Sequence, residues 1–374
     1  MQDNPSLALR NAASKGQVEE VKRLLLLHKD TKGFDINGKS SNGNTPLLWA
    51  ASKNPDAPIL VKTGKPGFEE KKEGEPDYKN FYDVMNVLFD AGTDDNVVSK
   101  TGETVYHFVH LTSLGLLWGA RLFEREIKRL AIPQSTPQEV NFFNALAPHL
   151  LSSLLVCLTS INFWAYVKDI QQTKKPFRIL SLGCGVALEL ILLNKLFRLL
   201  NIKWSYVGID NDPILIEANK RYFFNRSEFQ AEFYCLDATD PKVLTPLFAA
   251  HSFNMGFLRN GDFTESLGSR PLFVKMVDHV FPTFLEEGRP LFLTFQTEEE
   301  KQVCARQSKL LDYYSKKSSN NTFDRTADRE YIVNGCAITP DVSAAVMCYD
   351  SKAHQAELAK QNKAAIPTGA KNRR

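Results

Sequence analysis

The sequence has no cysteine pairs at metal-binding spacing, no long uninterrupted apolar run and no strong excess of charge of one sign. Its six cysteines are scattered through 374 residues without a Cys-x-x-Cys pair. That spacing excludes a zinc ribbon or zinc finger, so we expect no metal site. Scattered cysteines are typical of reduced thiols, and we therefore expect a cytoplasmic protein.

The apolar segment 142–167 is too interrupted to predict a membrane span. Asn144, Pro148, His149 and further polar residues divide it, and its longest apolar runs fall well short of the roughly 20 residues that a spanning helix needs. The first residues, Met1–Pro5, carry neither the charged nor the apolar part of a secretory signal. We expect a buried core helix here and no membrane partner.

The net charge is small and unevenly placed. It is +3 for the whole chain, yet residues 351–374 hold six Lys or Arg against Glu357 alone. A protein that binds the phosphate backbone of nucleic acid carries basic charge over its body as well. The near-neutral body therefore makes nucleic acid an unexpected partner, and we expect 351–374 to be a basic flexible tail.

The most informative motif begins at Ile179 and reads Ile-Leu-Ser-Leu-Gly-Cys-Gly-Val-Ala-Leu-Glu-Leu. An apolar strand that ends in Gly-x-Gly and continues as an apolar helix lets the backbone approach a ligand closely. The next apolar run ends at Asp210, an acid placed to accept hydrogen bonds from a ribose diol, and a third run, 231–238, contains Asp237 near its end. Parallel strands of this kind put their polar ends along one sheet edge, where open α/β sheets bind ligands.

This order of strands and polar ends resembles the class I S-adenosylmethionine-dependent methyltransferases. The resemblance implies an α/β Rossmann-like domain with a seven-stranded, mostly parallel sheet and S-adenosyl-L-methionine as cofactor. It implies that Gly183 and Gly185 flank the methionine part of the cofactor. It also implies that Asp210 holds the ribose hydroxyls and that Asp237 bonds the adenine amino group. The other residues that it assigns to the cofactor site are Ser181, Cys184, Asn211 and Ala238.

Two positions depart from the family pattern. The family usually carries an acid two residues before the first glycine, where this chain has Ser181, and a third glycine where it has Ala187. The Ser181 hydroxyl can still hydrogen-bond and Ala187 is small, so neither change excludes cofactor binding. The alternative is a Rossmann-like unit whose glycines serve only turn geometry and helix packing.

The N-terminal third carries a repeat. Asn42–Ser52 is similar to the ankyrin pattern Gly-x-Thr-Pro-Leu-His-x-Ala-Ala, with Leu in place of the His. Its Ala-Ala-Ser-Lys core also occurs at Ala12–Lys15, and Gly102–Thr104 keeps Gly-x-Thr without the Pro. We therefore expect an all-α ankyrin repeat domain over 1–130, with two clear repeats, one degenerate repeat and an insertion at 54–80. The usual role of such repeats implies a protein partner.

The remaining segments complete the expected domain organisation. Thr136–Glu139 is a capping box with Pro at the first helical position, so we expect linking and covering helices over 131–175. The methyltransferase domain should then occupy 176–350. We expect its last two strands, near 330–338 and 344–349, to form an antiparallel pair.

The fourth predicted strand ends at Arg259 and Asn260, on the same sheet edge as the glycine loop. In the class that the chain resembles, residues after this strand line the acceptor side of the methyl group, which makes Arg259 and Asn260 candidate catalytic residues. The alternative is that Arg259 forms a surface salt bridge and Asn260 belongs to a turn.

The predicted function is S-adenosylmethionine-dependent methyl transfer to a protein that the ankyrin repeats recruit. Two alternatives remain open: a methyltransferase-like binding protein without turnover, and a small-molecule methyltransferase. An ankyrin region beside a modifying domain also resembles effectors that intracellular bacteria inject into host cells. Because partner recognition and cofactor binding would lie on different elements, deletion of 1–130 should damage turnover on a protein substrate far more than cofactor affinity.

Overall fold

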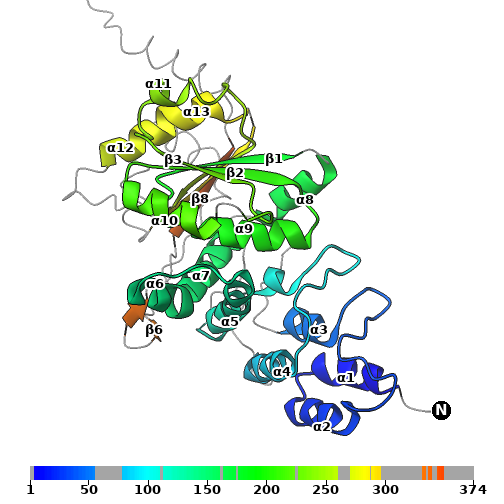
Figure 1. Cartoon of the computed structure of the whole chain (residues 1–374). Helices are drawn as coiled ribbons and strands as arrows, with labels where there is room; N and C mark the ends of the chain where they lie inside the picture. Colours follow the sequence, from blue (N-terminus) through cyan, green and yellow to red (C-terminus); the bar gives the residue numbers. More distant parts are fainter. Residues whose placement is uncertain are drawn as a thin grey trace, which may run out of the picture.

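The computed structural model describes residues 4–54, 78–109, 113–160, 163–173, 176–223, 226–259, 270–286, 288–295, 331–333, 336–338 and 343–348. Within these ranges a helical N-terminal region leads into a region in which helices cover both faces of a sheet (Figure 1). The predicted basic tail at 351–374 and most of the predicted insertion at 54–80 lie outside the described residues.

The helical region begins with two helix pairs that stack on one another, first helix on first helix and second on second. Both first helices start at a proline, and the residue before it caps the helix: Asn4 accepts from the Ser6 and Leu7 amides, and Thr45 accepts from the Leu48 amide. The four helices are α1 (Pro5–Ala13), α2 (Val18–His28), α3 (Pro46–Lys53) and α4 (Tyr78–Asp90).

A third unit follows in shortened form. Its first element is a single 3-10 turn, η1 (Val105–Phe108), and its second is the long helix α5 (Ser113–Leu130). Thr104 and His107 close a capping box around η1, in which the Thr104 amide donates to Nδ1 of His107 over 3.0 Å. The turn lacks the proline that begins α1 and α3, and this loss matches the degenerate repeat in the sequence.

The linking helices form one long rod with a wide turn in it. The capping box at Thr136–Glu139 is present, and a five-residue π-helical turn lies directly before Pro148. Proline has no amide hydrogen and its ring crowds the preceding turn, and the wider turn relieves this crowding without ending the helix. The elements are α6 (Pro137–Asn141), η2 (Phe142–Leu146), α7 (Ala147–Ser160) and α8 (Phe163–Thr173).

The rod from Pro137 to Thr159 is the candidate membrane span among the described residues. The rod is 23 residues long, its most apolar 18-residue stretch has a mean hydropathy of 1.6, and 61% of that stretch is buried inside the protein. Core helices of globular proteins meet the same criteria of length and composition. Figure 1 shows α7 between α5 and α9, which agrees with the buried core helix expected from the sequence.

The sheet has the strand order β3-β2-β1-β4-β5-β8, in which the first five strands are parallel and β8 is antiparallel to β5. The order reverses between β1 and β4, which is the position where open α/β sheets form a ligand crevice. The strands are β1 (Phe177–Leu182), β2 (Trp204–Asp210), β3 (Ala231–Cys235), β4 (Met255–Arg259), β5 (Pro290–Phe295) and β8 (Ser343–Cys348).

The end of the chain differs from the predicted antiparallel pair. The strands β6 (Tyr331–Val333) and β7 (Cys336–Ile338) pair with each other as a separate two-stranded sheet, and β8 alone joins β5. The main sheet therefore has six strands among the described residues rather than seven. The sequence between β6 and β7 is Asn-Gly, the dipeptide that most favours a two-residue hairpin, and this explains why the segment does not stay one strand.

Helices cover the two faces of the sheet in two layers (Figure 1). On one face lie α9 (Leu188–Leu199) and α10 (Pro213–Phe223). On the other lie α11 (Pro241–Leu244), α12 (Arg270–Lys275), the π-helical turn η4 (Met276–Val280) and α13 (Phe281–Phe284). The buried residues of the α9 face belong to one apolar core that extends through α7 and α5 into the ankyrin stack. This core includes Leu9 of α1 and Phe292 of β5.

The contact between α5 and α7 is close because Gly119 lies in it. A Cβ atom added to Gly119 would come within 2.2 Å of the Ser152 hydroxyl, and that hydroxyl donates to the Leu116 carbonyl over 2.9 Å. Glycine costs a helix roughly 1 kcal/mol relative to alanine, and here it allows the two helices to approach.

A buried cluster of charge joins the repeats to the sheet region. Lys195 of α9 is 3% exposed, and its Nζ lies 2.8 Å from Asp95 Oδ2 and 3.3 Å from Glu126 Oε2. Asp95 also bonds Tyr106 and Arg125, while Glu126 bonds side chains of α5 and α9. The ankyrin region and the α/β region therefore share an apolar core and an ion-pair network.

Candidate cofactor site

The glycine loop between β1 and α9 has the backbone conformation that its sequence predicts. Gly183 and Gly185 both have positive φ, 58° and 51°, a region that side-chain-bearing residues rarely adopt. A Cβ atom added at Gly185 would meet no atom within 4 Å, whereas one at Gly183 would meet only Leu258 at 3.9 Å. The loop therefore combines a left-handed backbone, which glycine adopts without strain, with open space beside it, as a cradle for a ligand requires.

Neighbouring elements hold this loop by hydrogen bonds. The Gly185 amide donates to Asp210 Oδ2 over 2.8 Å, and Asn219 Nδ2 donates to the Gly185 carbonyl over 2.5 Å. The Ala187 amide donates to Oδ1 of the same Asn219 over 3.1 Å. Asn219 lies on α10 and is completely buried, so it fixes the end of the loop from the second βα unit.

Asp210 lies at the end of β2 with 9% of its surface exposed. Its carboxylate accepts from the Gly185 amide and, through Oδ1, from the Asp212 amide over 3.0 Å. An ionised carboxylate offers about four acceptor positions, so about two remain for the hydroxyls of a diol. Asn211, which follows directly, is exposed.

Asp237 follows β3 and is exposed, while Ala238 beside it is buried. The Thr239 hydroxyl and amide both donate to Asp237 Oδ1, over 2.7 and 2.8 Å, and these bonds hold the pKa of the carboxyl below its ordinary value. The Leu236 amide donates to the Asp210 carbonyl, which ties the end of β3 to the end of β2. Asp237 is therefore an ionised acceptor on the same sheet edge as Asp210.

Cys184 contributes its backbone rather than its side chain. Its thiol is 1% exposed, and burial raises the pKa well above the ordinary value, so the thiol stays protonated and unreactive. The Cys184 amide donates to the Ile209 carbonyl over 3.0 Å.

Beneath the loop lies a carboxylate that the sequence reasoning missed. Glu189, in the first turn of α9, is completely buried. Its Oε1 accepts from the Ser181 and Tyr206 hydroxyls, each over 2.6 Å, and its Oε2 accepts from Arg259 Nε over 3.1 Å. Burial, followed by the charge of Glu189, raises the pKa of Tyr206 well above its ordinary value, which keeps that hydroxyl a donor.

Arg259 is held by groups of the protein itself. Its side chain is 13% exposed and pairs with Glu189, and its Nη2 donates to the Val186 carbonyl over 2.8 Å. Of the two sequence readings, the ion pair is the one found, although it is buried rather than on the surface. Asn260 lies outside the described residues.

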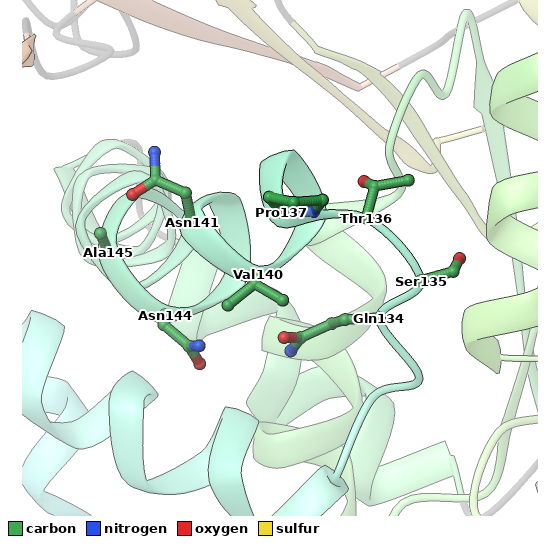
Figure 2. A pocket seen from close by; sticks show the side chains of 8 residues that line it. All are labelled: Gln134, Ser135, Thr136, Pro137, Val140, Asn141, Asn144 and Ala145. Atoms are coloured by element: carbon green, nitrogen blue, oxygen red, sulfur yellow. The ribbon is translucent and has the colours of Figure 1, made fainter.

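Two cavities flank the segment that leads into α6, one on each side. Figure 2 shows the first, a cavity of about 630 Å³ lined by residues 134–137 together with α6 and η2. The second, about 550 Å³, lies between α6 and the start of α10 and is lined in part by Pro213 and Ile214. Neither cavity is lined by the glycines or acids of the predicted cofactor site.

Comparisons with known proteins agree with the two-part architecture. The family model described as "Ankyrin repeats (many copies)" matches residues 9–61. No curated protein sequence matches the chain.

Solved structures similar to the chain include TrmN from Thermus thermophilus, at 12% identity, a TM-score of 0.30 and coverage of 49% of this chain and 47% of that one. They also include a SAM-dependent methyltransferase from Methanosarcina mazei, at 18% identity, a TM-score of 0.26 and coverage of 52% and 82%. The CMeT domain of citrinin polyketide synthase matches at 15% identity, with a TM-score of 0.35 and coverage of 94% and 98%.

Because these TM-scores are low, the fold assignment rests on the strand order of the sheet. The chain spans about half the length of TrmN, 47%. The chain joins an N-terminal ankyrin repeat region to an α/β Rossmann-like domain, and methyltransferases are among the solved structures similar to it.

Proposed function

We propose that the chain is an S-adenosylmethionine-dependent methyltransferase that acts on a protein recruited through its ankyrin repeats. The observation that carries this proposal is the contact between the glycine loop and Asp210. The Gly185 amide lies 2.8 Å from Asp210 Oδ2, so an open backbone cradle and a diol acceptor meet at one point of the sheet edge.

The residues present fit the cofactor that this function requires. Gly183 and Gly185 leave room for the methionine part, Asp210 retains acceptor positions for the ribose hydroxyls, and Asp237 offers an ionised acceptor to the adenine amino group. Asn211 and Ala238 lie beside these acids on the same edge. The cofactor, when bound, supplies an activated methyl group on a sulfonium.

The protein's own task in such a transfer is to hold the two reactants in line and to keep water out, because methyl transfer from a sulfonium needs little acid–base help. Arg259 is already paired with Glu189, so we assign it to the support of the site rather than to the acceptor. Asn260, next in the chain, remains our candidate for orienting the acceptor.

A protein acceptor is supported by the repeats and by an exposed apolar surface on them. Leu26 and Leu27, adjacent residues of α2, are 79% and 60% exposed. Leu26 borders a groove of about 510 Å³ between α2 and α4, with Phe34 and Val87 in its lining. Ankyrin repeats commonly bind other proteins, and this surface offers such a partner apolar contact area.

Calorimetric titration of the whole chain with S-adenosylhomocysteine tests the cofactor assignment. We expect one site per chain, and Asp210→Ala should weaken binding by about 2–4 kcal/mol because two charge-assisted bonds are lost. Asp30→Ala, an exposed acid after α2, is the matched control and should bind as the wild type does. Unchanged affinity in Asp210→Ala would show that the cofactor site lies elsewhere.

A binding protein without turnover is the second candidate. It is favoured by the ion pair that occupies Arg259, the one described candidate for an acceptor-side residue, and by Ser181 in place of the usual acid. Transfer of a radiolabelled methyl group to proteins incubated with the chain separates the two candidates. Cofactor binding without any labelled product favours the second.

A further inference from the structure

We propose that Glu189 provides the carboxylate that the family pattern places two residues before the first glycine. In this chain that position is Ser181, and its hydroxyl donates to Glu189 Oε1 over 2.6 Å. The acid thus comes from the helix after the loop instead of the strand before it. This inference rests on the proposed function, because it concerns how the cofactor loop is held.

The position of Glu189 supports this role. Ser181 lies near the carboxyl end of β1, in register with Gly208 of β2 and Phe257 of β4. An aspartate at 181 would carry its carboxylate about one bond length beyond the present hydroxyl, toward the oxygen that Glu189 already places there. The Glu189 carboxylate therefore occupies the space that an acid at position 181 would occupy, and it supplies the negative charge.

One carboxylate connects the three strands whose ends frame the site. Glu189 accepts from Ser181 of β1, Tyr206 of β2 and Arg259 of β4. A buried carboxylate is costly unless its lone pairs are satisfied and its charge is compensated, and here three donors, one of them the Arg259 guanidinium, meet both needs. The arrangement is a built polar cluster inside an otherwise apolar layer.

The cluster reaches the loop itself through Arg259. While Nε of Arg259 pairs with Glu189, its Nη2 donates to the Val186 carbonyl over 2.8 Å, directly after Gly185. The charge of Glu189 therefore fixes the guanidinium, and the guanidinium fixes the last turn of the glycine loop. Glu189 acts on the cofactor through the loop, so it is a positioning residue.

An exchange of the acid between the two positions tests the proposal. Glu189→Gln should weaken binding of S-adenosylhomocysteine at least tenfold, because the amide presents a donor to Arg259 and removes the charge. The exchange variant S181D/E189S returns the acid to the strand and should bind within about threefold of the wild type. Ser181→Ala, which removes only one hydroxyl, is the matched control and should lose much less than Glu189→Gln.

Melting temperatures recorded for the same proteins separate positioning from general stability. If Glu189→Gln melts lower than the wild type but binds with wild-type affinity below its transition, the carboxylate only stabilises the fold and the proposal is wrong. It is equally wrong if the exchange variant folds, melts like the wild type and still binds tenfold more weakly. If the wild type itself binds no S-adenosylhomocysteine, the proposed function fails, and this inference falls with it.

Discussion

Helix α9 carries two buried charges, and they serve different parts of the molecule. Glu189, in its first turn, bonds side chains of β1, β2 and β4 beneath the glycine loop. Lys195, six residues later, bonds Asp95 and Glu126 of the ankyrin region instead. Both charges are almost completely buried, so each depends on the partners that its own surroundings supply.

The difference between the two clusters shows which part of the α/β region depends on the repeats and which part does not. The Glu189 cluster is complete within the α/β region, whereas the Lys195 cluster is complete only when the repeats are in place. The sequence-based expectation that deletion of 1–130 damages turnover far more than cofactor affinity takes no account of the Lys195 cluster. The region removed contains the partners of a buried lysine on the helix that begins at the cofactor loop.

Deletion of residues 1–130 should have the largest effect. It removes both acids that pair with Lys195 and uncovers α7, and removing the partner of a buried ion pair costs about 3–5 kcal/mol by itself. We expect a protein that is insoluble or lacks a cooperative melting transition, measured by circular dichroism. A truncated chain that melts and binds S-adenosylhomocysteine like the full chain would remove the distinction between the two clusters.

Lys195→Met should have a smaller effect and tests the same cluster in the full chain. The methionine keeps much of the apolar stem while Asp95 and Glu126 keep their arginine partners, so we expect a loss of about 3 kcal/mol in the free energy of unfolding. Denaturant titration measures that loss. Cofactor affinity should stay within about twofold, in contrast to Glu189→Gln, and a tenfold loss would show that the two clusters act as one.

A mild acid effect should arise at His107, on the repeat side of this boundary. The His107 ring stacks on Trp164 of α8 at 3.5 Å between centroids, and burial lowers its pKa from 6.5 to about 3. Below pH 6.5 His107 therefore binds a proton in the unfolded chain but not in the folded chain. The free energy of unfolding falls as the pH drops from 6.5 toward 3.

The variant His107→Gln isolates this effect, because glutamine suits the same capping-box position and does not titrate. Between pH 7 and pH 5 the wild type should lose about 1–2 kcal/mol more than the variant in denaturant titrations. Equal losses in both proteins would assign the acid sensitivity to other groups.

The parts predicted correctly from the sequence are those that local pattern determines. The strand before Gly183 and the parallel order of the sheet both follow from the residues at those positions. The π-helical turn before Pro148 could not be foreseen, because the pattern shows only that a regular helix is disturbed there. The hairpin at β6 and β7 did have a signal, the Asn-Gly pair, which we gave too little weight.

The Glu189 cluster was missed although two signals for it were present. Helix α9 is apolar around its whole circumference, so its acid and its lysine had to be buried and had to find partners. Arg259 lies two residues after Phe257, and side chains alternate along a strand. Phe257 packs in the core on the α9 face of the sheet, so Arg259 lies on that face as well. What the sequence could not give is which buried partner each charge meets, because the partners come from distant segments.

The shared core also decides where the repeat array can change its length. The last repeat unit is covered by α7 and tied to α9 through Lys195, so an extra repeat placed there would separate the lysine from its acids. The other side of the stack has no such tie among the described residues, and α2 exposes Leu26 there. The repeat array is therefore joined to the α/β region at one end only among the described residues. Further repeats added before α1 should lengthen the array without disturbing the cofactor loop.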